Sequence, residues 1–249
     1  MIRTLLIITG ASLVLCAAAA AGAAAIGGND LARNNWTWTF RDDDEDHTVR
    51  FERGDDGPPV TRQLAWTGGD RLQIDIPGDV IYVQGPEASV VLTGQKSMVD
   101  RVRLVDGRLA YDDDEGTEHV VFGWNVHDRL KVVVTAPSVT AFALESSADL
   151  SIRDYDQPTL ALTVSGSGDV DGAGRAQTAT VDVSGSGDVD LYSLEATDAD
   201  VDVSGSGDVR VAATGTAKVD ISGSGDVDFA RRPAKLEQNI SGSGDLSQN

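Results

Sequence analysis

The chain has 249 residues, of which 41% are hydrophobic, and its formal net charge at pH 7 is −20. This length and apolar content suffice to bury a substantial core, in one elongated domain or in two. The charge argues against binding to nucleic acid or to an anionic membrane surface, because both are polyanions. A surface with this negative charge instead favours contact with cations, basic surfaces or water.

Residues 1–27 are typical of a signal peptide or an N-terminal membrane anchor. Arg3 supplies a positive start, residues 5–15 form an apolar region, and the Ala-rich sequence that follows offers small-residue cleavage sites. We expect export with cleavage of this segment. The uncharged stretch of residues 4–28 is also long enough to cross a bilayer, so an uncleaved hydrophobic helix that contacts the membrane is the alternative.

The single cysteine, Cys16, lies inside this segment and raises the question of a lipidated N-terminus. Leu15, directly before it, is too large for the usual lipobox, so we do not expect lipidation. The rest of the chain has no cysteine and therefore has neither a disulfide nor a thiol active site.

Residues 28–63 are polar and include an acidic run at residues 42–46. A charge run beside Pro and Gly is typical of a solvated linker. Trp36 and Trp38 lie in an alternating stretch that would also suit a short strand or a membrane interface. We therefore expect an acidic linker with a transient or docked strand.

Short strands are predicted from residue 64 onward. Pro-Gly-Asp, Gly-Pro, Asp-Gly and Ala-Pro turns separate them, and no helical periodicity of useful length appears. The predicted strands cover residues 72–76, 80–83, 89–93, 102–105, 109–111 and 130–134. Residues 112–124 interrupt this rhythm with an acidic run and are predicted to form an exposed loop.

The pentapeptide Ser-Gly-Ser-Gly-Asp occurs five times in the last third of the chain. Its copies begin 18 to 20 residues apart, at Ser165, Ser184, Ser204, Ser222 and Ser241. Residues 145–149, Glu-Ser-Ser-Ala-Asp, resemble a degenerate earlier copy. A fixed period near 20 residues is typical of a solenoid, in which each coil buries its apolar face only against its neighbours.

Apolar and polar residues alternate on both sides of each pentapeptide, which indicates two half-buried strands per coil. About 19 residues leave no room for a helix as well, so the sequence predicts an all-β fold, a β-helix of parallel strands with Gly-rich turns. Each coil should consist of a strand, a tight turn, a second strand and a looser return. The residues directly before the turns are predicted to point inward, and they are Val164, Val183, Val203, Ile221 and Ile240.

The arrangement of residues 64–249 resembles a known bacterial family. Strands of the type at residues 72–83, the turn Asp106-Gly107-Arg108-Leu109 and a strand ending in Pro137 precede the series of Ser-Gly-Ser-Gly-Asp coils. This order is similar to the family described as "putative auto-transporter adhesin, head GIN domain", a domain of unknown function. The resemblance implies a right-handed parallel β-helix and an exported envelope protein, and it brings no catalytic residues.

The glycines of the pentapeptides are predicted to shape the turns. A tight corner between two strands needs a positive φ, which only glycine adopts easily. The predicted turn glycines are Gly166, Gly168, Gly185, Gly187, Gly205, Gly207, Gly223, Gly225, Gly242 and Gly244.

Stacking of the coils should place the last residue of each pentapeptide in one column, made of Asp169, Asp188, Asp208, Asp226 and Asp245. Carboxylates about 4.8 Å apart repel by roughly 0.9 kcal/mol in water and by more when partly buried. A solvated column needs no ion, whereas a partly buried one needs backbone N–H donors or a cation such as Ca²⁺. The column is therefore a candidate cation site, and otherwise we expect no cofactor.

Other motifs lack the context that their chemistry needs. The Gly-x-Gly pairs lead into strands rather than a helix, and no Gly-x-Ser-x-Gly elbow is present. His47, His119 and His127 are scattered over the predicted linker and loop, which favours surface histidines over a metal site. Polysaccharide cleavage would need two carboxylates beside Arg153 or Arg210, and the repeats carry no aromatic stripe for sugars.

The sequence thus predicts an exported, non-enzymatic β-helix module with a structural or adhesive role in the periplasm, the outer membrane or the cell surface. The alternative is a cation- or glycan-binding module that uses the stacked acidic turn face, and a polysaccharide-cleaving enzyme ranks third. The expected partner is an unknown envelope or surface molecule. Gln238 replaces an apolar residue in the last coil, so we expect a polar cap and a monomer.

Overall fold

The computed structural model describes residues 37–42, 45–53, 58–112, 117–122 and 129–248, with the backbone alone before residue 54 and between 117 and 122. The predicted signal peptide or hydrophobic helix of residues 1–27 lies outside these ranges, as does Cys16. No helix within the described ranges is long and apolar enough to cross a membrane. The chain divides into two compact units, one of residues 1–54 and 113–124 and one of residues 55–112 and 125–249.

The smaller unit contains a sheet in which β1 (Thr37–Asp42) pairs antiparallel with β2 (Glu45–Arg53), and β2 pairs in parallel with β9 (Thr117–Phe122). The expected linker of residues 28–63 allowed for a docked strand, and β1 and β2 lie within it, whereas the loop expected at residues 112–124 contains the strand β9. Both segments were assigned to solvent because of their charge. Pairing of these strands with one another satisfies their backbone N–H and C=O groups. A local sequence pattern does not reveal pairing between segments that are far apart in the chain.

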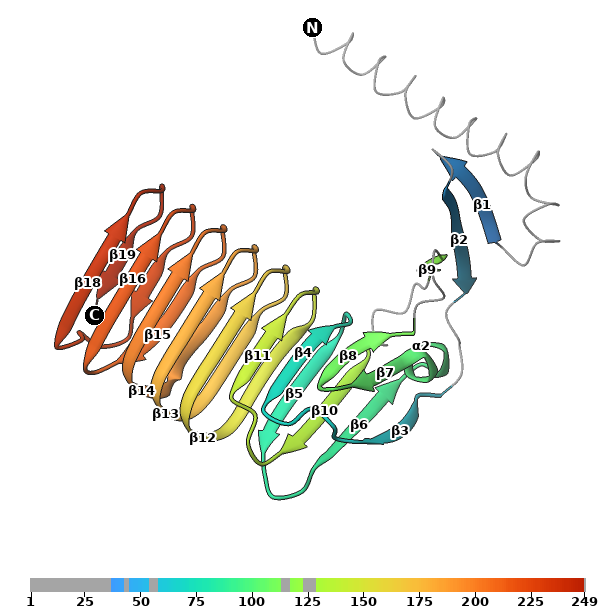
Figure 1. Ribbon diagram of the computed structural model, residues 1–249, viewed down its shortest axis with the longest axis horizontal. Helices are drawn as coiled ribbons and strands as arrows, with labels where there is room; N and C mark the ends of the chain where they lie inside the picture. The colour runs from blue at the N-terminus through green and yellow to red at the C-terminus, as the bar shows by residue number, and fades with distance from the viewer. Residues whose placement is uncertain (1–36, 43–44, 54–57, 113–116, 123–128, 249) are drawn as a thin grey trace, which may run out of the picture. The chain divides into compact units, whose positions relative to one another are not determined.

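The larger unit is an all-β solenoid with two sheet faces and about five regular turns (Figure 1). The first face consists of the strands that lead into the turns, and the second face of the strands that follow them. In the middle of the unit, three long strands contribute to both faces: β12 (Asp149–Val164), β13 (Val170–Val183) and β14 (Val189–Val203).

The remaining strands extend each face on either side of these three. The first face also contains β7 (Val102–Val105), β8 (Arg108–Tyr111), β4 (Arg71–Asp75), β11 (Ala141–Leu144), β16 (Thr216–Ile221) and β18 (Lys235–Ile240). The second face also contains β3 (Val60–Ala65), β6 (Ser89–Gly94), β10 (Lys131–Ala136), β5 (Asp79–Gln84), β15 (Val209–Ala213), β17 (Val227–Phe229) and β19 (Leu246–Gln248). Pairing is parallel except among β3, β6 and β10 and between β7 and β8.

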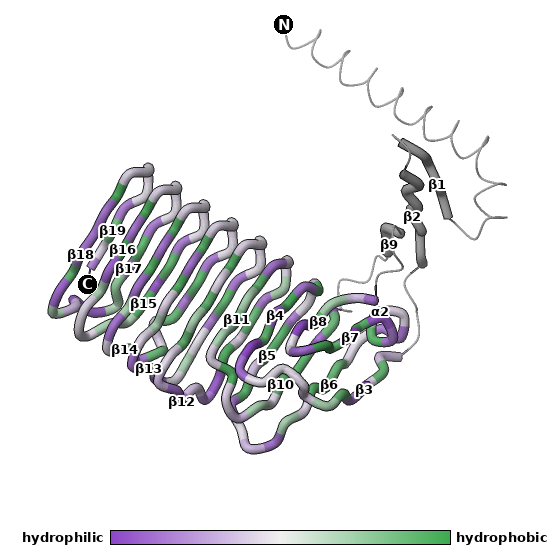
Figure 2. The backbone as a smooth tube through the Cα atoms, viewed as in Figure 1, coloured by the Kyte–Doolittle hydropathy of each residue, from purple (hydrophilic) through white to green (hydrophobic). Residues whose placement is uncertain are grey.

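Successive coils stack in register, so equivalent residues of the repeats lie in columns. Val164, Val183, Val203 and Ile221 are paired in this way and are fully buried. Figure 2 shows the result as an alternation of apolar and polar positions along the strands of both faces. The predicted all-β fold and strands are confirmed, and so are the inward columns except at Ile240, which is exposed, because burying one face of a strand requires this register.

The returns of the first three coils differ from the prediction. We expected a looser segment there, but β12, β13 and β14 each run without a break from one turn to the next. The chain changes direction inside the strand, through register shifts such as the one between Ile152 and Tyr155. Bulges of this kind bend a strand while keeping most of its ladder. From β12 onward in the described residues, loose returns occur after β15 and after β17.

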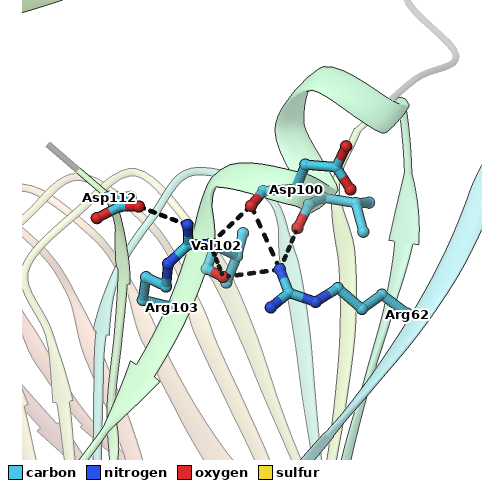
Figure 3. Close-up of polar contacts among 6 residues, drawn as sticks. Arg62, Asp100, Val102, Arg103 and Asp112 are labelled. Atoms are coloured by element: carbon cyan, nitrogen blue, oxygen red, sulfur yellow. Dashed lines mark hydrogen bonds and ion pairs between the residues drawn. The ribbon is translucent and has the colours of Figure 1, made fainter. Parts of the chain in front are cut away.

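A short helix, α2 (Lys96–Arg101), packs against β3 and β6 and was not predicted. Arg62 of β3 holds it in place: Nη1 donates to the carbonyl oxygens of Val99, Asp100 and Val102 at 3.2, 3.3 and 3.2 Å (Figure 3). The last carbonyls of a helix have no partner within the helix. One guanidinium therefore satisfies the end of α2 and joins it to the sheet.

The last coil is the least buried part of the solenoid. Ile240 is 39% exposed, whereas the residues before it in its column are buried completely. Gln238 is exposed and Leu236 is half-buried. The polar replacement noted in the sequence thus coincides with an open strand edge, and the expected monomer stays a prediction.

Candidate functional site

The turn glycines lie where the sequence placed them, between the two faces, but the reason given for them was wrong. None of the ten has a φ in the left-handed region. Instead, a Cβ built on any of them would lie 1.7–2.0 Å from a carbonyl oxygen of the preceding coil. Glycine is required because the backbones of neighbouring turns approach too closely for a side chain.

Backbone hydrogen bonds accompany this close approach. The N–H of Ser186 donates to the carbonyl oxygen of Gly166 at 3.0 Å, and Ser206 donates to Gly185 at the same distance. The degenerate copy joins the stack, since the N–H of Ser167 donates to the carbonyl oxygen of Ser146 at 3.3 Å. The serine and glycine positions of the motif therefore build a continuous backbone ladder along one edge of the solenoid, which we call the turn edge.

The five predicted aspartates form a column along the turn edge, and Asp149 of the degenerate copy extends it. We call this set the aspartate column. From Asp169 onward, Oδ1 of each residue accepts a hydrogen bond from the backbone N–H of the next aspartate, at 2.8–2.9 Å. The contact from the N–H of Asp169 to Oδ1 of Asp149 is longer, at 3.4 Å.

The first end of the aspartate column carries a basic residue that the sequence did not single out. Nη1 of Arg129 lies 3.1 Å from Oδ2 of Asp149 and 3.5 Å from Oδ1 of Asp79. Asp79 pairs in register with Asp149, so it prolongs the column by one position. Asp149 could have been found from its place in the degenerate copy, but Arg129 belongs to no repeat.

Most carboxylates of the aspartate column are exposed; Asp208 is half-buried. Exposure was the feature expected to decide between a solvated column and a cation site. Water and one backbone donor per carboxylate reduce the repulsion between neighbours without an ion. In the part of the chain with described side chains, no group of three or more His, Cys, Asp or Glu is arranged to hold a metal ion.

A second acidic column lies on the first face, where Asp182, Asp202 and Asp220 are paired in register. Partial burial raises the pKa of Asp202, and the negative charges of Asp182, Asp220 and Asp200 raise it further. Lys218 acts in the opposite direction. Asn239 follows Asp220 in this column and donates from Nδ2 to its Oδ2 at 3.1 Å.

The remaining candidates are not brought together. His47 and His119 belong to strands whose side chains are not described, and His127 lies outside the described residues. Arg210 is paired in register with Asp190 and Asp228, but neither it nor Arg153 makes an ion pair with a described side chain. The grouping of two carboxylates around one of these arginines, which an enzyme reading would need, is not formed by them.

The family described as "putative auto-transporter adhesin, head GIN domain" matches residues 70–233. The chain belongs to this family. The match covers the solenoid from β4 to the return before β18, and so includes four of the five pentapeptides. No curated protein matches the chain.

Two solved structures with the same fold are described as putative adhesins. One from Bacteroides fragilis NCTC 9343 is 18% identical, covers 80% of this chain and 100% of its own, and has a TM-score of 0.61. One from Parabacteroides distasonis ATCC 8503 is 17% identical over the same shares, with a TM-score of 0.53. At these sequence identities, the similarity shows that this chain shares the fold of the solved structures, and it identifies no ligand.

Proposed function

We propose that the protein is an exported, non-enzymatic module of the cell envelope with an adhesive or structural role, carried on a right-handed solenoid. The observation that carries this proposal is the aspartate column. Its polar groups recur at every coil, and each Oδ1 from Asp169 to Asp226 is engaged by a backbone N–H of the next coil. Because the repeated side chains join each coil to the next, the solenoid is a stiff scaffold with long exposed faces. Such a scaffold suits attachment to another surface rather than catalysis.

The family supports the same proposal. Its description as a putative auto-transporter adhesin head suggests an exported or surface protein, and two solved structures with the same fold are described as putative adhesins. Residues 1–27 supply the export or anchoring segment expected from the sequence. The compartment that we propose is the periplasm, the outer membrane or the cell surface.

Cell fractionation tests the proposal directly. Antibodies against the solenoid should detect the protein in the envelope fractions, and mass spectrometry of the purified protein should show whether residues 1–27 are removed. Loss of the gene should reduce attachment of cells to surfaces, or weaken the envelope against detergent, and the intact chain should restore the phenotype. Protein confined to the cytoplasm would overturn the proposal.

A second candidate function is cation binding by the aspartate column. The observation that favours it is the stacking itself, which brings carboxylates of consecutive coils together with only one oxygen of each used by a backbone donor. Ca²⁺ prefers carboxylate oxygens and tolerates irregular geometry. Thermal melting in EDTA and in millimolar Ca²⁺ decides between this candidate and a purely structural column.

A further inference from the structure

The edge of the solenoid opposite the turn edge is hollowed into a groove. In Figure 1 this edge is the row of lower ends of the coils, next to the labels of β12, β13 and β14. The groove has a volume of about 610 Å³ and is lined by residues 156–158, 175–177 and 195–197 with Thr214 and Arg231. We call it the return groove. Its volume lies within the range of small-ligand sites, and every coil from β12 to β17 contributes to it.

Small residues make the floor of the return groove. Ala176 and Ala196 are paired in register and are only 8% and 4% exposed. Each is flanked in the chain by two exposed, longer side chains, Arg175 and Gln177 around the first, and Glu195 and Thr197 around the second. Because each alanine packs into the core while its two neighbours in the chain are exposed, the middle of the edge lies lower than its two sides.

The two sides carry different groups. Asp156, Arg175 and Glu195 are paired in register along one side, so that their charges alternate from coil to coil. Nη2 of Arg175 lies 3.5 Å from Oδ2 of Asp156, an exposed contact that contributes little to stability. The other side presents the amide of Gln177 and the hydroxyl of Thr197. Both sides therefore offer hydrogen-bond donors and acceptors to a bound molecule.

Arg231 stands at the end of the return groove nearest the last coil. It is exposed, and within the described ranges its guanidinium makes no ion pair or hydrogen bond with another side chain or carbonyl group. Its donors are therefore available to a ligand. Arg232, the next residue, is also exposed but does not line the groove.

The charge of the return groove selects the ligand class. The four charged residues that line it, Asp156, Arg175, Glu195 and Arg231, have formal charges that cancel, whereas the chain as a whole carries −20. A polyanion would be repelled by the whole protein. No aromatic or large aliphatic side chain lines the groove, so an apolar ligand would gain little there. A neutral molecule rich in hydroxyl groups matches the lining best.

The length of the groove adds a second restriction. Coils stack about 4.8 Å apart, so five coils span roughly 19 Å. One sugar unit of an extended chain advances by about the same length as one coil, so each unit would lie over one coil of the groove, although the side groups differ from coil to coil. We propose that the return groove binds a linear, neutral oligosaccharide of about four units. This inference rests on the proposed adhesive function and names the ligand class for it.

Calorimetric titration of the full chain with defined oligosaccharides tests the inference. The probes are β-1,4-linked N-acetylglucosamine and β-1,4-linked glucose chains of two to six units, and oligogalacturonate of matched length serves as the anionic comparison. We expect binding of a neutral series that tightens up to about four units, since a groove of finite length saturates. The anionic probe should bind more weakly.

Matched variants locate the binding. Arg231→Ala should weaken it about tenfold, as expected for one lost hydrogen bond to a charged group. Arg232→Ala makes the same change of charge one residue away and should leave the affinity within about twofold. Thr197 is exposed and lines the groove, so the indole of Thr197→Trp would fill the groove and should abolish binding. A thermal melt of this variant checks that the solenoid stays folded.

Failure to bind any neutral probe would overturn the inference, as would binding that Arg231→Ala and Thr197→Trp leave unchanged, or preference for the anionic chain. None of these results touches the proposed envelope role, which fractionation and attachment assays measure separately. Chromatography of the oligosaccharide probes after incubation distinguishes the inference from the proposed function. Shortened oligosaccharides would support the groove as a sugar site and would refute the non-enzymatic function.

Discussion

The backbone N–H of Asp188 donates to Oδ1 of Asp169 across 2.9 Å, from one coil of the solenoid to the one before it. The same bond recurs from Asp208 to Asp188 and from Asp226 to Asp208. A side chain that looked like a ligand group thus serves the ladder of the turn edge. Several expectations depend on this role.

Replacing Asp188 by Ala removes the acceptor for the N–H of Asp208, and we expect a loss of about 1 kcal/mol in the free energy of unfolding. Asp188→Asn keeps the acceptor and removes one charge from the column, so its stability should equal or exceed that of the parent. Asp182→Ala is the control, because this exposed side chain makes no hydrogen bond with a described residue; it should lose no stability, since removing its charge also relieves repulsion with Asp202. Urea unfolding measures all three. Equal losses for Asp188→Ala and Asp182→Ala would contradict the ladder role.

Gly187→Ala tests the steric origin of the turn glycines. A Cβ at this position would lie 2.0 Å from the carbonyl oxygen of Gly168, so neighbouring turns must separate, and we expect a cost of about 2 to 3 kcal/mol. Gly69 is the comparison: its φ is +57°, and nothing lies within 4 Å of a Cβ placed there. Gly69→Ala should cost about 1 to 2 kcal/mol from backbone conformation alone. If thermal or urea unfolding shows a smaller loss at Gly187 than at Gly69, close approach is not the reason for the motif.

The contrast between these glycines shows how far the sequence could predict the fold. Spacing and alternation were sufficient to place the turns, the inward columns and the stacked aspartates, because each repeats in every coil. Whether Gly187 is needed for its φ or for contact with Gly168 depends on the distance between coils, which no single coil contains.

Features that occur once were missed for a related reason. Pairing of β2 with β9 joins segments more than 60 residues apart, and both had the acidic composition of solvated loops. Arg129 reaches Asp149 and Asp79 from outside the repeats. The return groove was missed because an alanine in a predicted strand indicates only a small buried residue. The stacking of the coils, which places Ala176 beside Ala196 between exposed neighbours, is not visible in one coil.

Asp202 should make stability depend on pH. Its pKa is raised by partial burial and by the neighbouring carboxylates, so the folded state holds its proton to a higher pH than the unfolded state. Stability from this group is therefore fully present below the usual carboxyl range and is lost as the pH rises through the raised pKa. Asp202→Asn should raise the melting temperature at pH 7, and the gain should vanish below about pH 4.

Asp190→Asn is the matched control for this titration. Asp190 is also exposed and stacked, but one of its neighbours in register is Arg210, so removal of its charge relieves no comparable repulsion. Its melting temperature at pH 7 should not rise. A gain at Asp202 that persists unchanged at low pH would show that the effect comes from packing and not from charge.

Calcium should leave the melting temperature of the protein unchanged. Each carboxylate of the aspartate column from Asp169 to Asp226 accepts a backbone N–H and is largely solvated, so neither repulsion nor an unfilled ligand shell calls for an ion. Melts in EDTA and in millimolar Ca²⁺ should coincide once NaCl equalises the ionic strength, since a chain of charge −20 gains from any screening. Binding at a hundred times Kd would add about 2.7 kcal/mol and move the melt by several degrees. A rise specific to Ca²⁺ that disappears in the double variant Asp188→Asn with Asp208→Asn, which keeps the ladder bonds, would establish the aspartate column as a cation site instead.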